Sequence, residues 1–145
     1  MTSGASESAG SAQLDDSGLE ILSDDECRRL LPSVAIGRVV FTDQALPAVQ
    51  PVRFAVDDDA VVIRQAAGAR WAARVGDAVI AFQVDDIDPL NGRGWTVTAV
   101  GRGEYVTDAA ERDRLAGLAP QSWAPAPGDQ VVRIQIEMLT GRRLG

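Results

Sequence analysis

Three arginines, Arg64, Arg70 and Arg74, surround a turn of small residues centred on Gly68. The apolar run 60–63 that precedes them is typical of a half-buried strand. Glycine and alanine in the turn allow the backbone to come close to a ligand. Because the chain has a formal net charge of -7, this local gathering of positive charge predicts a binding site for an anion.

Two interpretations of this stretch remain open from its residues alone. In the first, Gly68 and Arg70 hold the phosphate of a nucleotide-like cofactor, and the backbone amides of a short helix predicted over 69–75 add donors. In the second, the arginines are solvated side chains at the start of a surface helix, since charge runs usually face solvent. The remainder of the sequence has to decide between them.

The residue types that are missing restrict the chemistry. The chain has no histidine, and all 14 basic residues are arginine. This excludes Ser-His-Asp and Cys-His pairs, histidine-bound metal or haem, and a lysine Schiff base. We therefore predict no catalytic side chain, and an enzyme with this composition would depend on a bound cofactor for its reaction.

Length and composition predict one domain with a tail. A chain of 145 residues can bury roughly 70% of its unfolded surface. Residues 1–21 are rich in serine, glycine and alanine, which predicts a disordered tail, and 22–145 form the domain. We expect a cytoplasmic protein without membrane contact, because no apolar run approaches about 20 residues and no signal pattern is present. The acidic balance argues against nucleic acid as a partner.

The first predicted helix covers 24–31. Ser23 and Glu26 have the spacing of a capping box, and Leu22 and Cys27 have that of a hydrophobic staple. An activated thiolate beside the following arginines is an alternative for Cys27. The staple position favours burial of this side chain instead. A lone cysteine also excludes an internal disulfide.

Apolar segments of strand type dominate the rest of the chain. Pro51, which cannot donate to a ladder, predicts an edge, a bulge or a break that faces a ligand. Gly101 and Gly103 predict a bend. A second helix is expected over 108–118. The predicted fold is mainly β, an antiparallel barrel with peripheral helices, and its six strands are 36–42, 48–56, 60–65, 78–84, 94–106 and 131–140.

The last of these strands has the clearest alternation. Val132, Ile134, Ile136 and Met138 alternate with polar residues, which predicts that these four side chains share the buried face. Two acidic runs, 57–59 and 85–88, have the composition of solvated turns, and we predict no metal site in them.

The order of these motifs resembles the pyridoxamine 5'-phosphate oxidase-like split-barrel flavoproteins, in particular their small bacterial members rather than the true oxidase. The resemblance covers 22–144. It rests on the order and spacing of LSDDECRRLL, IGRVVFT, QPVRF, VVIRQAAGAR, VIAFQVDDID, GWTVTAVGRGEYV and RIQIEMLTGRRL. It implies a split β-barrel that binds FMN, and a homodimer with two FMN sites at the subunit interface.

The resemblance also implies cofactor-binding positions. The strand and turn from Arg64 to Arg70 would face the phosphate, backbone at 51–53 would edge the isoalloxazine, and Trp95 would lie near the ring from either protomer. Arg142 would lie near the cofactor or the interface. The complete predicted set is Pro51, Val52, Arg53, Arg64, Gln65, Gly68, Arg70, Trp95 and Arg142.

The implied activity is that of an FMN-dependent oxidoreductase, which reduces small electrophiles with a reduced nicotinamide donor. Two alternatives stay open, because Gln65 and Ala69 stand where relatives often carry hydroxyl side chains. One is a reductase that uses the deazaflavin coenzyme, whose acidic tail needs a longer basic groove that includes Arg74 or Arg142. The other is a non-catalytic flavin-binding module. The sequence lacks the Arg-and-His signature of the true oxidase, which disfavours oxidation of vitamin B6.

Overall fold

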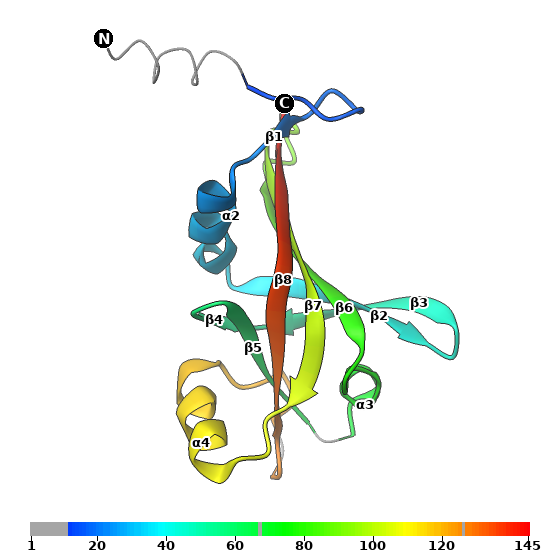
Figure 1. Cartoon of the computed structure of the whole chain (residues 1–145), viewed down its shortest axis with the longest axis vertical. Helices are drawn as coiled ribbons and strands as arrows, with labels where there is room; N and C mark the ends of the chain where they lie inside the picture. Colours follow the sequence, from blue (N-terminus) through cyan, green and yellow to red (C-terminus); the bar gives the residue numbers. More distant parts are fainter. Residues whose placement is uncertain (1–11, 67, 126) are drawn as a thin grey trace.

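The protein forms one curled antiparallel sheet with helices on its outside (Figure 1). The computed structural model describes residues 12–66, 68–125 and 127–145. The sheet has eight strands in the order β3-β2-β6-β7-β8-β5-β4, and β1 pairs with β8. The strands are β1 (Glu20–Ile21), β2 (Ile36–Asp43), β3 (Leu46–Arg53), β4 (Ala55–Asp57), β5 (Ala60–Gln65), β6 (Val79–Ile87), β7 (Gly94–Tyr105) and β8 (Gln130–Leu144). This confirms the predicted mainly β split barrel.

A single residue closes the barrel. Strands β3 and β4 lie at opposite ends of the sheet, yet only Phe54 separates them in the chain. The ring of Phe54 is buried and packs edge-on against Phe82, with ring centroids 4.8 Å apart. The predicted strand 48–56 is therefore broken at Phe54. Pro51 lies on the edge strand β3, and an edge was one of the three positions predicted for this proline.

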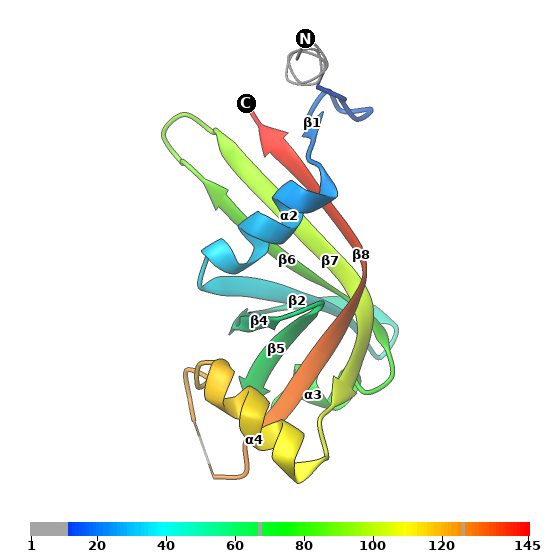
Figure 2. The same ribbon diagram turned by 60° about the vertical axis from the view of Figure 1, so that its left-hand side comes forward.

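Strand β8 holds the two halves of the molecule together. Its 15 residues extend roughly 50 Å at about 3.3 Å per residue. One side pairs with β7 along nearly its whole length, while the other side pairs first with β5 and then with β1. Figure 2 shows β8 running past the barrel to the C-terminus, with β7 antiparallel beside it. The two ends of β8 therefore belong to different parts of the surface.

A bulge in β8 changes which side chains face the core. Val100 pairs with Met138, and Gly101 pairs with Ile136, so Glu137 is the extra residue. Beyond it the alternation changes phase. Met138 is 59% exposed, whereas Leu139 packs against the core. The prediction that Met138 shares the buried face was wrong, because alternation cannot reveal a bulge in advance.

Two apolar cores hold the helices. The larger core fills the barrel and includes Phe82, Ile63 and Ile134. The smaller core lies between α4 (Ala109–Leu118) and the outer face of β5 and β8, and contains Leu115 and Val62. The sequence explains why α4 begins here, because the Asp108 side chain accepts a hydrogen bond from the Glu111 amide at 3.0 Å.

Helix α2 (Asp24–Leu30) lies against the far half of β8 and is followed by a short turn of 3-10 helix, η1 (Leu31–Ser33). The Ser23 hydroxyl accepts from the Glu26 amide at 3.2 Å, as predicted. The carboxylate of Glu26 pairs with Arg143 at 2.9 Å. The other half of the predicted capping box is therefore replaced by a contact to β8.

The segment before α2 differs from the predicted tail. Its first 11 residues lie outside the described part of the chain. Residues 12–21 form a turn around Asp15, a bridge from Leu14 to Glu20, and strand β1. Asp15 accepts from the Leu19 amide and from Arg142. Composition predicted disorder here because it reflects only the residues of the segment itself. The segment is held in place by a residue far along the chain, Arg142, through its ion pair with Asp15.

Across the described ranges, no helix is long and apolar enough to cross a membrane.

Candidate functional site

Two of the three predicted arginines meet at one carboxylate. They begin and end α3 (Arg70–Arg74), a helix slightly shorter than the predicted 69–75. The Nε atom of Arg70 is 3.2 Å from Oδ2 of Asp43, and that of Arg74 is 3.0 Å from Oδ1. Asp43 is only 13% exposed, whereas the side chain of Arg70 is 78% exposed. The pair of guanidinium groups is therefore attached to the barrel at one side and open to solvent at the other.

Gly68, two residues before α3, has open space around it. A Cβ placed on Gly68 would meet no atom within 4 Å, and the backbone of Gly68 does not need a positive φ. Neither packing nor conformation within the chain requires glycine at this position. The open space and the two arginines together fit a phosphate group.

Arg64 does not join this pair. Strand β5 points successive side chains to opposite faces, and Arg64 lies on the same outer side as Val62, which packs under α4. One Nη atom donates to the carbonyl of Ala116 at 3.3 Å, and another is 3.8 Å from Asp129. The structure thus separates Arg64 from Arg70 and Arg74, which the sequence places together. Gln65, beside Gln130 on β8, ends the strand.

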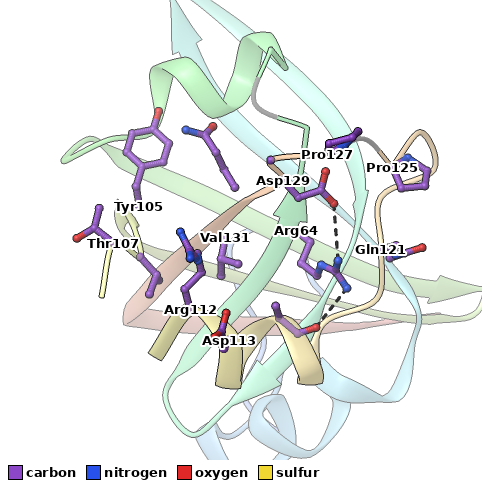
Figure 3. A pocket seen from close by; sticks show the side chains of 14 residues that line it. Arg64, Tyr105, Thr107, Arg112, Asp113, Gln121, Pro125, Pro127, Asp129 and Val131 are labelled. Carbon is purple, nitrogen blue, oxygen red and sulfur yellow. Dashed lines mark hydrogen bonds and ion pairs between the residues drawn. The ribbon is translucent and has the colours of Figure 1, made fainter. Parts of the chain in front are cut away.

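Arg64 instead lines a cavity of about 750 Å³ between α4, residues of 121–125 and 127–129, and the ends of β5 and β8 (Figure 3). The walls carry two guanidinium groups, two carboxylates, two amides, an aromatic ring and two prolines. They are formed chiefly by Arg64, Tyr105, Thr107, Arg112, Asp113, Gln121, Pro125, Pro127, Asp129 and Gln130. No sequence pattern indicated this cavity, because its walls come from segments with no shared motif.

Of the predicted backbone site at 51–53, only Arg53 comes to the edge of this cavity. Val52 is buried in the barrel, while Pro51 and Arg53 are exposed on β3. A guanidinium nitrogen of Arg53 donates to the carbonyl of Gln121 at 3.4 Å. Since Gln121 lines the cavity, the structure brings Arg53 and Arg64 to one region of the surface.

Trp95 and Arg142 lie at the other end of the molecule. Trp95 pairs with Asp86 and Arg143, and Arg142 forms a 2.7 Å ion pair with Asp15. Helix α3 lies beside Gly103, whose carbonyl accepts from the Asp77 amide. From Gly103 to Trp95 is roughly 26 Å along β7. Within one chain, Trp95 and the C-terminal end of α3 therefore lie near opposite ends of β7.

The described residues offer little acid–base chemistry. The Cys27 side chain is fully buried, and burial, followed by the charges of Asp24 and Glu26, raises the pKa of its thiol. The activated-thiolate alternative is therefore wrong. No group of three or more acidic or cysteine side chains in the described ranges could hold a metal ion.

The fold and these arginines define a split-barrel protein with an exposed pair of arginines on α3 and a separate polar cavity under α4. The chain belongs to the family described as pyridoxamine 5'-phosphate oxidase, whose model matches residues 23–143. This confirms the resemblance.

Individual relatives span most of the chain. The uncharacterized protein Rv0080 of Mycobacterium tuberculosis is 40% identical over 128 residues, which is 85% of this chain and 84% of the relative. An FAD binding protein from Mycobacterium smegmatis has 31% identity and a TM-score of 0.71, over 86% of this chain and 96% of that one. A proposed pyridoxamine 5'-phosphate oxidase from Corynebacterium glutamicum has 29% identity and a TM-score of 0.75, over 86% and 97%.

Proposed function

We propose that this chain binds a flavin nucleotide and acts as a flavin-dependent oxidoreductase that reduces small electrophiles with a reduced nicotinamide donor. The observation that carries the proposal is the pair Arg70 and Arg74, attached to Asp43 and open to solvent beside Gly68. The FAD binding relative from Mycobacterium smegmatis supports a flavin as the ligand. A bound flavin supplies the hydride or electron transfer, and this chain binds and orients it.

The flavin we propose is FMN, held through its phosphate by Arg70 and Arg74. FAD carries a phosphate at the same position of its flavin half, and the FAD binding relative makes it the first alternative. Backbone amides near Gly68 would add donors in place of the hydroxyl groups that Gln65 and Ala69 lack. Pro51, Val52 and Arg53, on the edge strand β3, are proposed to border the ring system.

One observation bears on the deazaflavin coenzyme. Its acidic tail needs further positive charge, and Arg74 supplies it next to Arg70 through their common partner Asp43. Arg142 is already paired with Asp15 at 2.7 Å at the far end of β8. A groove that extends along α3 therefore agrees better with this coenzyme than one that reaches Arg142 in the same protomer.

We further propose a homodimer in which Trp95 from one protomer completes the flavin site of its partner. The position of Trp95 and of the end of α3 near opposite ends of β7 supports this, because a second protomer would bring its own Trp95 to the arginines of the first. Arg142, near Trp95 at the same end of the molecule, would lie at this interface.

The first test is the visible absorption spectrum of the purified chain after incubation with FMN, FAD or the deazaflavin coenzyme and removal of unbound ligand. The proposal predicts about one retained flavin per chain and oxidation of a reduced nicotinamide donor. Retained flavin without such oxidation would favour the non-catalytic module. Failure to retain any of the three at micromolar protein would refute the proposed cofactor.

Subunit complementation tests the shared site. R70A and W95A should each lose flavin, and refolding an equal mixture should restore about a quarter of the sites, since half of the dimers then contain one intact site. Each variant refolded alone is the control. No recovery in the mixture, with dimers present by light scattering, would show that Arg70 and Trp95 do not share a site across the interface.

A further inference from the structure

The cavity under α4 has two charged side chains that nothing in the described part of the chain engages. Arg64 and Asp129 pair with each other across the cavity floor at 3.8 Å. The side chains of Arg112 and Asp113 form no hydrogen bond or ion pair with any residue of the described ranges, although both line the cavity. Neighbouring charges on α4, such as Arg114 with Glu111 at 2.9 Å, are paired. The cavity therefore contains one uncommitted guanidinium group and one uncommitted carboxylate.

Arg112 is well placed to receive an anion. In Figure 3 its side chain extends from α4 towards the space bordered by Thr107 and Val131. A guanidinium group presents donors in a planar fork that matches a carboxylate or phosphate in two-point contact. Thr107 and Gln130 add uncharged hydrogen-bonding groups to the same walls.

Charge limits which anion fits. The pair Arg64–Asp129 is neutral, and Arg112 is offset by Asp113, so the lining carries no net charge. A group with one negative charge can satisfy Arg112, whereas a dianion would be opposed by both carboxylates. The remaining walls, Tyr105 with the two prolines, offer flat apolar surface for a ring. The volume of about 750 Å³ lies within the usual range for small-molecule sites.

We propose that this cavity binds a small organic monocarboxylate with a flat ring, and that Arg112 holds its carboxylate. The site differs from the proposed flavin phosphate site, because α3 and its partner Asp43 form no part of its lining. Partly buried Arg64 stays with Asp129 and shapes the floor, and its Nε is buried with no hydrogen-bond partner in the described ranges. Binding in this cavity does not depend on which flavin occupies the other site.

The test uses benzoate, benzamide and phenyl phosphate as probes of the full chain. Amide and arginine Nε signals in two-dimensional ¹H–¹⁵N spectra report binding without reference to any reaction. Benzoate should shift the signals of Tyr105, Arg112 and Gln130 and bind at least tenfold more tightly than benzamide, which has the same shape without the charge. Phenyl phosphate, a dianion at pH 8, should bind more weakly than benzoate.

Variants locate the binding. R112Q should weaken benzoate at least tenfold, while R29Q, which removes an exposed helical arginine from α2, should leave it unchanged. D113N should improve phenyl phosphate selectively, because one opposing charge is lost. Equal affinity for benzoate and benzamide, tighter binding of phenyl phosphate by the unmodified chain, or full affinity in R112Q would each overturn the proposal. Flavin retention is measured in a separate experiment. A failure of the flavin site would therefore not be mistaken for a failure of benzoate to bind in the cavity.

Discussion

Asp43 and Arg74 approach to 3.0 Å between a carboxylate oxygen and the Nε atom, and the same carboxylate also pairs with Arg70. Neither pair has the geometry of a hydrogen bond, and the Oδ1 atom of Asp43 is buried without a hydrogen-bond donor in the described ranges. Asp43 therefore acts on these arginines mainly through its charge.

We expect D43N to tighten flavin binding. A phosphate on the outer side of the guanidinium groups would lie about 7 Å from the Asp43 carboxylate. At an effective dielectric constant between about 40 and 80, removal of that charge gains ~0.6–1.2 kcal/mol, or roughly three- to eightfold in Kd. Fluorescence titration with FMN measures this change. D77N, which removes a charge from the exposed turn after α3, is the control, and weaker binding by D43N would show that Asp43 orients the arginines.

R70A tests the phosphate assignment directly. We expect at least a tenfold rise in the Kd for FMN, because a charge-assisted hydrogen bond contributes about 1.5–3 kcal/mol. The melting temperature should change little, since this side chain is 78% exposed and Asp43 keeps Arg74 as its partner. R29A, which removes an exposed arginine outside the proposed site, is the control and should leave the Kd for FMN unchanged. Unchanged affinity in R70A would remove Arg70 from the site.

Gly101 and Gly117 should respond oppositely to alanine. A Cβ on Gly101 would lie 1.7 Å from the backbone oxygen of Gln135, so β7 and β8 would have to separate at the bulge. We expect G101A to lose about 1–3 kcal/mol or more of unfolding free energy. G117A, within α4 and with no atom within 4 Å, should gain up to about 1 kcal/mol. Urea denaturation measures both, and equal effects would contradict the bulge geometry.

The ion pairs under α4 predict a loss of stability in acid. Hydrogen bonds from Arg114, and then from Arg133, lower the pKa of Glu111 from 4.5 to about 2. A depressed carboxyl pKa stabilises the fold above the unfolded pKa and loses this effect as pH falls from about 4.5 to 2. In thermal melts at pH 7, 4 and 3, the difference in melting temperature between the unmodified chain and E111Q should therefore become smaller as the pH falls. E137Q, outside this network, should follow the unmodified chain, and a constant difference for E111Q would contradict the pKa shift.

Cys27 should react slowly with a thiol reagent in the native state. Its side chain has no exposed surface, and burial raises the pKa of its thiol, so little thiolate is present at neutral pH. Ellman's reagent should label about one thiol per chain in guanidinium chloride and almost none in buffer. Fast labelling of the folded chain would mean that α2 separates readily from β8.

The sequence by itself determined the local elements of this protein. Alternation and turn residues predicted five strands that the structure contains and a sixth, 48–56, that it divides into β3 and β4. Ser23 and Asp108 marked the starts of α2 and α4, because a cap needs only residues a few positions away. The motif order identified the family, and the burial of Cys27 followed from its spacing to Leu22.

Only the tertiary structure decided how distant residues combine. The bulge at Glu137, the order of residues 12–21 and the separation of Arg64 from Arg70 depend on Gly101, Arg142 and Asp129, none of them near in sequence. Asp43 joined Arg70 and Arg74 because the end of β2 comes close to α3. The cavity around Arg112 exists because the segment that includes Gln121 returns to the barrel, where its carbonyl accepts from Arg53, a contact that no local pattern of residues specifies.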